Sequence, residues 1–224
     1  MNCEINILKQ EVRIALDQNM SSDPLIAISD IDTLSLDQII ESKIEDAARV
    51  VLRDAPNYLL DGGVSFGNAD HTYSVEWFGQ KAGLGGGYIL LPEDFLRLVS
   101  FQMSDWSRAV SVAITEDNPL YARQSSRYGG IRGCPQKPVV ALVPYSTGLA
   151  LEFYSCTMGD SVTVKKGTYI PMPTIKDEGG TKTIEFCEKL KPAIVHYTAY
   201  LVALTLGQNE LAATLLNTSK ELMQ

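Results

Sequence analysis

The chain has 224 residues, a length that fits one large domain or two small ones, and its 45% hydrophobic and 21% charged residues form an ordinary globular balance. Its 27 acidic residues outnumber 19 basic ones, which gives a net charge of −8. This charge repels phosphate backbones and therefore argues against generic nucleic-acid binding. It does not argue against a protein that surrounds DNA without binding it tightly. No run of about 18 apolar residues occurs, so the sequence predicts no membrane span.

The first part of the chain predicts two amphipathic helices. Apolar residues from Ile5 to Leu16 recur at helical spacing, and the turn formers before Pro24 end the pattern. Ser35 offers an N-cap with Gln38 three residues later, which is the capping-box pattern, and Pro56 ends the helix that follows. The charges of residues 1–18, also at helical spacing, are not those of a signal peptide.

From Asp61 to about Glu185 the pattern changes to that of β-structure. Residues 72–77 alternate between apolar and polar side chains, as in a half-buried strand. Residues 83–87 and 128–138 are rich in glycine or proline and are predicted as loops. Many short strands with turns between them favour an antiparallel sheet or a small sandwich. The further strands are expected at residues 88–91, 96–103, 109–114, 139–143, 149–154 and 161–170.

Helical patterns return at Phe186 and continue to the end of the chain. Pro192 suits a first turn, Gly207 supplies a C-terminal cap, and the helix between them is apolar nearly all round, which is typical of a buried helix. A last helix from about Glu210 is expected to turn Leu211, Leu215 and Leu222 toward its antiparallel partner.

The fold class that follows is α+β. We expect one domain over residues 1–224, in which the helical parts, 1–60 and 186–224, pack as a bundle. The β-rich part, residues 61–185, is expected to be an antiparallel middle region that projects from this bundle.

The most distinctive segment is residues 87–98, in which an apolar strand enters a proline turn and an alternating strand leaves it. Proline fixes its φ and begins the turn, an acidic side chain accepts hydrogen bonds from free amides, and apolar side chains anchor the turn to the core. The segment has no nucleophile, histidine or metal-ligand spacing, which indicates architecture rather than catalysis. The residues expected to mark it are Pro92, Asp94 (or Glu93), Phe95, Leu96, Arg97, which can pair with a neighbour's carboxylate, and the later Trp106.

A local excess of basic residues lies in the predicted loop, where Arg123, Arg127, Arg132 and Lys137 occur close together. One interpretation is a solvated loop, and the other is a contact arm that reaches an acidic neighbour or a DNA phosphate, because the planar guanidinium matches both groups. If it is an arm, charge reversal at Arg127 and Arg132 weakens assembly and leaves the melting temperature of the monomer nearly unchanged.

No catalytic, cofactor or metal site is predicted. The glycines of residues 83–87 lack the further glycine that a dinucleotide fingerprint needs at position 88, where Tyr88 stands. The two histidines, His71 and His196, have no cysteine or glutamate at metal-ligand spacing, and His196 is expected to be a hydrogen-bonded core residue. The four cysteines are widely spaced, which favours reduced, mostly buried thiols in a cytosolic protein and leaves a disulfide or a zinc site as the alternative.

This order of elements resembles the head–tail connector proteins of tailed bacteriophages, the adaptor or gatekeeper ring beneath the portal. The tail tubular protein A type of short-tailed phages is the most similar group. Three segments carry the likeness: residues 87–98, residues 106–110 and the closing helical hairpin, residues 193–222. Residues 64–78, 83–87 and 157–188 depart from the family pattern.

The resemblance implies a structural subunit of a phage or prophage connector, located in the virion or in the host bacterial cytoplasm. Its partners would be other copies in a dodecameric ring, the portal protein and a tail protein, with DNA passing through the lumen and no cofactor or membrane involved. Such proteins assemble on meeting their partner, so the isolated chain can be a monomer. Two alternatives stay open: an enzyme of unrecognised type with a pocket between the β-region and the helices, and a bacterial surface or secretion module.

Overall fold

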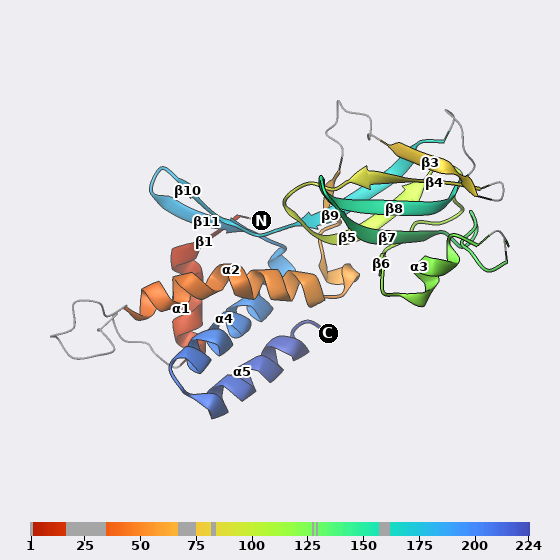
Figure 1. Cartoon of the computed structure of the whole chain (residues 1–224). Helices are drawn as coiled ribbons and strands as arrows, with labels where there is room; N and C mark the ends of the chain where they lie inside the picture. Colours follow the sequence, from red (N-terminus) through yellow and green to blue (C-terminus); the bar gives the residue numbers. More distant parts are fainter. Residues whose placement is uncertain are drawn as a thin grey trace. The chain divides into compact units, whose positions relative to one another are not determined.

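The computed structural model of the chain describes residues 2–16, 35–66, 75–81, 84–126, 128, 130–156 and 162–224. The chain divides into two compact units, which we call the helical unit (Met1–Asp61 with Met172–Gln224) and the β-unit (Gly62–Pro171). Helices and mostly antiparallel sheets are both present, so the α+β class is confirmed (Figure 1). Among the described residues, no helix combines the length and apolarity that a membrane crossing needs.

Four α-helices form most of the helical unit: α1 (Ile5–Ala15), α2 (Leu36–Asp54), α4 (Lys191–Thr205) and α5 (Asn209–Glu221). Helix α4 packs against the other three and lies beside α2 and α5 in Figure 1. This central place explains much of the apolar character of α4, because contacts on several sides bury seven of its residues, although Leu204 near its end is 43% exposed. The short helix η1 (Asn57–Leu59) follows α2, and the short helix η2 (Glu188–Leu190) leads directly into α4.

Local signals fix the helix ends as expected. The Ser35 Oγ accepts a hydrogen bond from the Gln38 amide at 3.3 Å, and the Ser35 amide donates to the Gln38 Oε1 at 2.9 Å, which completes the capping box. At the end of α4, Gly207 has a φ of 75°, and the Gln208 amide donates to the Ala203 carbonyl at 2.9 Å.

The prediction that Leu211, Leu215 and Leu222 turn toward the antiparallel partner of α5 is wrong in part. Leu222 is 40% exposed because it lies past the last residue of α5, whereas Ala212, Leu215 and Ser219 are buried. The Ser219 hydroxyl donates to the Ala193 carbonyl at 2.9 Å. Small residues on this face let α5 approach α4 closely, and a leucine stripe alone does not identify them.

A small antiparallel sheet in the helical unit was not predicted. It has the order β1 (Asn2–Glu4), β11 (Thr181–Glu185), β10 (Ile175–Glu178). Strands β10 and β11 are mostly exposed and rich in charge, which hides the strand pattern, and β11 pairs with the beginning of the chain. The β-unit therefore ends at Pro171, short of the predicted β-rich range 61–185. That both units behave as one domain stays a prediction.

Ion pairs connect the elements of the helical unit. The Glu41 carboxylate of α2 accepts hydrogen bonds from Lys182 of β11 and Lys9 of α1, and Arg13 donates to Asp37 at 2.7 Å. The bonds from Lys182 and Lys9 hold the pKa of Glu41 below its ordinary value of 4.5. Because the folded-state pKa is the lower one, this stabilisation is present above pH 4.5 and is lost as the pH falls through the folded pKa.

We expect Glu41→Gln to reduce the acid sensitivity of the helical unit. In the native chain, the free energy of unfolding followed by circular dichroism at 222 nm should fall as the pH decreases below 4.5, and the fall should be smaller in the variant. Glu178→Gln, at an exposed position of β10, is the control. Its free energy of unfolding should fall with decreasing pH as much as that of the native chain. Equal acid sensitivity in the native chain and Glu41→Gln would contradict the assignment.

The β-unit consists of two sheets. One has the order β2 (Val64–Ser65), β9 (Val164–Pro171), β5 (Phe95–Met103), and the other has the order β3 (Glu76–Lys81), β4 (Leu84–Leu90), β8 (Gly148–Cys156), β7 (Val139–Tyr145), β6 (Ile114–Thr115). Strands β6 and β7 are parallel, so the expected antiparallel region holds one parallel pair. The long connection between them, which contains α3 (Pro119–Arg123), lets the chain return in the same direction. Of the predicted strand at 109–114, only a bridge at Val110 and the first residue of β6 form.

An aromatic core joins the two sheets. Phe101 of β5 and Phe153 of β8 are both fully buried, and their ring centroids lie 5.9 Å apart. Phe101 also contacts the rings of Phe66 at 6.3 Å and Trp106 at 5.6 Å. The core of the β-unit therefore lies between the sheets, as in a small sandwich.

The loop predicted at residues 83–87 is wrong from Leu84 onward. Gly85, Gly86 and Gly87 belong to β4, which pairs with both β3 and β8. A Cβ at position 87 would lie 2.5 Å from the Glu76 carbonyl oxygen and 2.7 Å from the Phe153 Cζ. Glycine is therefore needed here for close approach within the sheet, and not for a turn.

Candidate functional site

The proline turn lies where the sequence predicts it. The Phe95 amide donates to the Pro92 carbonyl at 3.1 Å, and the Asp94 Oδ1 accepts a hydrogen bond from the Tyr169 hydroxyl at 2.8 Å. Burial and this bond raise the pKa of Tyr169 to about 12. Asp94 thus ties the turn to β9, a contact that the expected role of accepting amide hydrogen bonds did not include.

The remaining marker residues lie in or against the core of the β-unit. The Phe95 ring stacks on Tyr169 with centroids 5.8 Å apart, Leu96 and Arg97 are half-buried in β5, and Trp106 is 3% exposed. The Gln102 side-chain amide donates to the Trp106 carbonyl at 3.0 Å. These contacts stabilise the fold, and a pairing of Arg97 with a neighbouring copy stays a prediction.

We call residues 118–138, which lie between β6 and β7, the arm, and the structure describes all of these residues except 127 and 129. Asn118 caps helix α3, because its side-chain oxygen accepts a hydrogen bond from the Leu120 amide at 3.0 Å. Gln124, 6% exposed, donates to the Leu120 carbonyl at 2.8 Å and accepts from the Gly133 amide at 2.9 Å. One buried amide side chain therefore connects the outgoing and returning halves of the arm.

Gly133, in the returning half of the arm, is tightly packed against its neighbours. A Cβ there would lie 2.3 Å from the Ser155 Oγ, 3.1 Å from the Val139 Cγ2 and 3.2 Å from the Lys137 carbonyl oxygen. Ser155 is itself buried, with a φ of 87°. The returning half of the arm is thus held against the end of β8, where a non-glycine residue already adopts a strained conformation.

We expect Gly133→Ala to lower the free energy of unfolding of the β-unit by about 2 kcal/mol, because the added methyl group overpacks this contact. The measurement is urea denaturation followed by tryptophan fluorescence, since both tryptophans, Trp77 and Trp106, lie in the β-unit. Gly130→Ala is the matched control in the same arm, because a Cβ there meets nothing within 4 Å. Equal stabilities of the two variants would contradict the tight fit.

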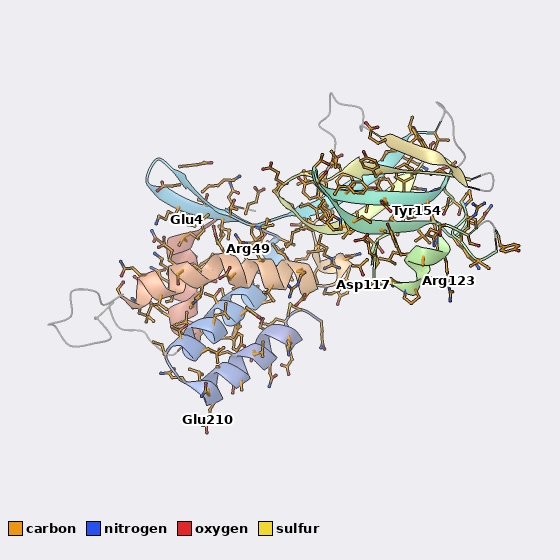
Figure 2. The ribbon with its side chains drawn as sticks, viewed as in Figure 1. Glu4, Arg49, Asp117, Arg123, Tyr154 and Glu210 are labelled. Atoms are coloured by element: carbon orange, nitrogen blue, oxygen red, sulfur yellow. The ribbon has the colours of Figure 1, made fainter. Side chains whose placement is uncertain are left out.

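A buried carboxylate with tyrosine donors lies on the outer face of the five-stranded sheet. Glu152 of β8 is 5% exposed, and it accepts hydrogen bonds from the Tyr145 hydroxyl at 2.6 Å and from the Tyr154 hydroxyl. Tyr121 of α3 meets the Tyr154 ring edge-on at 6.2 Å, and Tyr88 meets the Tyr145 ring at 4.8 Å. We call these five residues the tyrosine cluster, and it holds α3 onto the sheet (Figure 2).

In the tyrosine cluster, tyrosine hydroxyl groups donate hydrogen bonds to the Glu152 carboxylate. Burial and the hydrogen bonds to Glu152 raise the pKa of Tyr145 and of Tyr154, and burial raises that of Tyr121. At neutral pH these hydroxyl groups stay protonated and satisfy the buried carboxylate. This is the opposite of the lowered pKa that a tyrosinate base requires.

The outer surface of the arm combines apolar and cationic side chains. Leu120, Tyr128 and Ile131 are 41%, 58% and 51% exposed. Arg123 and Lys137 are also exposed, and Figure 2 shows Arg123 on α3. The sequence between Asp117 and Glu152 contains four basic residues and no acidic one. The arm therefore presents a mixed apolar and basic surface on a segment that is packed against the sheet.

Two of the predicted contact arginines are poor probes of this surface. Arg127 lies outside the described residues, and Arg132 is half-buried with a buried Nε. Reversal of the Arg132 charge would therefore perturb the fold of the arm as well as a contact. Arg123, which is exposed, is the appropriate residue for a test of assembly.

Sequence reasoning missed Glu152, Tyr145, Tyr154 and Gln124. The one available signal was a carboxylate inside the apolar strand predicted at 149–154. Predicted core residue His196 is half-buried, with its Nδ1 2.8 Å from the Pro192 carbonyl oxygen, and His71 lies outside the described residues. The four cysteines are free thiols, and within the described part of the chain no three potential ligands gather for a metal ion.

The sequence matches no protein-family model and no curated protein at a significant level.

Proposed function

We propose that the chain is a structural subunit of a phage or prophage head–tail connector, a ring of copies between portal and tail through which DNA passes. The observation that carries this proposal is the arm. It is fixed from beneath by Gln124, Gly133 and the tyrosine cluster, and it exposes apolar and cationic side chains to solvent. A contact surface whose residues are already held by hydrogen bonds and packing loses less conformational entropy on assembly than an unstructured loop would.

The roles of the marker residues support an architectural function. Pro92, Asp94, Phe95 and Trp106 hold a turn and an aromatic core, and none of them lies in a cluster of convergent ionisable groups. In this role the chain catalyses no reaction and needs no cofactor. The enzyme and surface-module alternatives stay predictions, since no described cluster of side chains favours either.

The proposed architecture is a bundle formed by the helices of the two chain ends. The packing of α4 against α1, α2 and α5 supports this arrangement. The β-unit inserted between these ends would project from the bundle and carry the arm to a sibling copy. Contacts between two different surfaces that close on rotation generate a ring, and the resemblance implies that this ring is a dodecamer.

Co-assembly with a portal tests this function. The chain should be mixed with the portal protein encoded in the same genome, and native mass spectrometry should then show portal rings that have gained a complete set of chains. Arg123→Glu should reduce this assembly without changing the melting temperature, because Arg123 is an exposed residue. Portal rings that gain no copies of the native chain would contradict the proposal.

Passage of DNA through the ring predicts weak binding of DNA. With a net charge of −8, the chain should show no salt-sensitive affinity in a mobility-shift titration. Tight binding that salt releases would argue for a DNA-gripping protein instead.

A further inference from the structure

The charge of the chain divides unequally between its two units. The helical unit holds 18 of the 27 acidic residues and 10 of the 19 basic ones, which leaves nine of each in the β-unit. The whole net charge of −8 therefore belongs to the helical unit, whereas the arm carries only basic charge. A basic arm and an acidic helical unit attract each other when they belong to different copies.

An apolar stripe on α1 offers the arm a place to dock. Ile7 and Ile14 are 43% and 66% exposed, and they lie seven residues apart, so they share one face of the helix. Ile5, Leu8 and Val12 cover the opposite, buried face. Carboxylates flank the stripe. Glu4, which Figure 2 labels, is exposed at the N-cap of α1. Glu11, which pairs with Lys191, lies between the two isoleucines in the sequence. We call Glu4, Ile7, Glu11 and Ile14 the α1 stripe.

The two surfaces match in chemistry. The arm exposes the apolar side chains of Leu120 and Ile131 and the cationic side chain of Arg123, and the α1 stripe exposes two isoleucines and the carboxylate of Glu4. Burial of these apolar side chains would drive the contact, and the opposite charges would set its register. An arm that met another arm would bring like charges together, so a two-fold contact between arms is disfavoured.

We infer that the arm of one copy docks on the α1 stripe of a second copy, and that this head-to-tail contact is the repeated interface of the assembly. The inference rests on the proposed function in that it names the contact between neighbouring subunits. Every copy has both surfaces, so each subunit would contribute its arm to one contact and its α1 stripe to another, which is the heterologous arrangement that a ring requires.

Disulfide cross-linking between two different variants tests the contact. Cys134 is half-buried and is replaced by Ser, and the other three cysteines are buried. One variant then carries Ile131→Cys, and the other carries Ile7→Cys and an affinity tag that distinguishes its mass. Oxidation of the concentrated mixture should give a disulfide-linked heterodimer, and neither variant alone should give a comparable product.

Leu204→Cys provides the matched control for Ile7→Cys. Leu204 lies on α4 of the same unit and is 43% exposed, as Ile7 is. The mixture with Ile7→Cys should give at least tenfold more heterodimer than the mixture with Leu204→Cys. Arg123→Glu, added to the arm variant, should lower the yield by about tenfold, because it opposes the flanking carboxylates with a like charge.

Three outcomes overturn the inference: equal yields with the two helical-unit variants, efficient linkage of Ile7→Cys to itself, and no product at any concentration at which the chain is soluble. Co-assembly with portal rings is measured separately. If the chain assembles on portal rings but the cross-link does not form, the proposed function is supported and this interface is refuted. If the cross-link forms specifically but the chain does not assemble on the portal, the interface is supported and the connector function is refuted.

Discussion

Glu152→Ala is expected to lower the free energy of unfolding of the β-unit by about 3 kcal/mol. The substitution leaves the hydroxyl groups of Tyr145 and Tyr154 without their acceptor on a covered face of the sheet, and each buried unsatisfied group costs about 1–3 kcal/mol. The cluster also seats α3 through Tyr121, so trypsin should cleave the variant after Arg123 faster than the native chain.

Two control variants separate this effect from simple loss of charge. Glu93→Ala removes an exposed carboxylate of the same unit and should change the stability by less than about 0.5 kcal/mol. Glu152→Gln keeps one acceptor oxygen, so its loss in the free energy of unfolding should lie between those of Glu93→Ala and Glu152→Ala. Urea denaturation followed by tryptophan fluorescence gives all three values, and a loss below about 1 kcal/mol for Glu152→Ala would contradict the role of the cluster.

Phe101→Ala is expected to have the largest effect on stability, a loss of about 4 kcal/mol from the β-unit. The ring of Phe101 is fully buried and contacts the rings of Phe66, Trp106 and Phe153, so its removal leaves a cavity between the two sheets.

The same variant tests whether the two units unfold together. Tryptophan fluorescence reports on the β-unit alone, because Trp77 and Trp106 are the only tryptophans of the chain, whereas circular dichroism at 222 nm reports mainly on the helices. Each unit is compact by itself, so we expect the fluorescence transition to move to lower temperature and the helical transition to stay in place. Coincident shifts of both signals would instead support one cooperative domain over residues 1–224.

Local signals in the sequence predict the helices well. The structure confirms three such signals: the capping box of Ser35 and Gln38 at the beginning of α2, Pro192 in the first turn of α4, and Gly207 just past the end of α4. Each of them acts through neighbouring residues of the chain. The proline turn at Pro92 is confirmed for the same reason, since its closing hydrogen bond is local.

Features that depend on distant residues could not be predicted in this way. Gly87 is a strand residue because Glu76 and Phe153 approach it, and β11 becomes a central strand because it pairs with β1 at the other end of the chain. The acceptor role of Glu152 likewise needs Tyr145, from the neighbouring strand. Such contacts are set by the register of the sheets, which alternation along one strand does not determine.

The candidate site was only partly visible in the sequence. The basic excess at Arg123, Arg127 and Arg132 indicated a contact arm, but it gave no sign that Arg132 is half-buried or that Gln124 holds the arm together. The apolar part of the surface, Leu120, Tyr128 and Ile131, becomes evident only through exposure, because isolated apolar residues in a loop have no periodicity.

Electron microscopy of the chain mixed with the portal protein of its own genome tests the central claim most directly. The connector proposal predicts class averages in which a closed ring of chains lies coaxially on the portal, with each arm at a boundary between neighbouring copies. Portal particles without an added ring, together with chains that remain single, would contradict it.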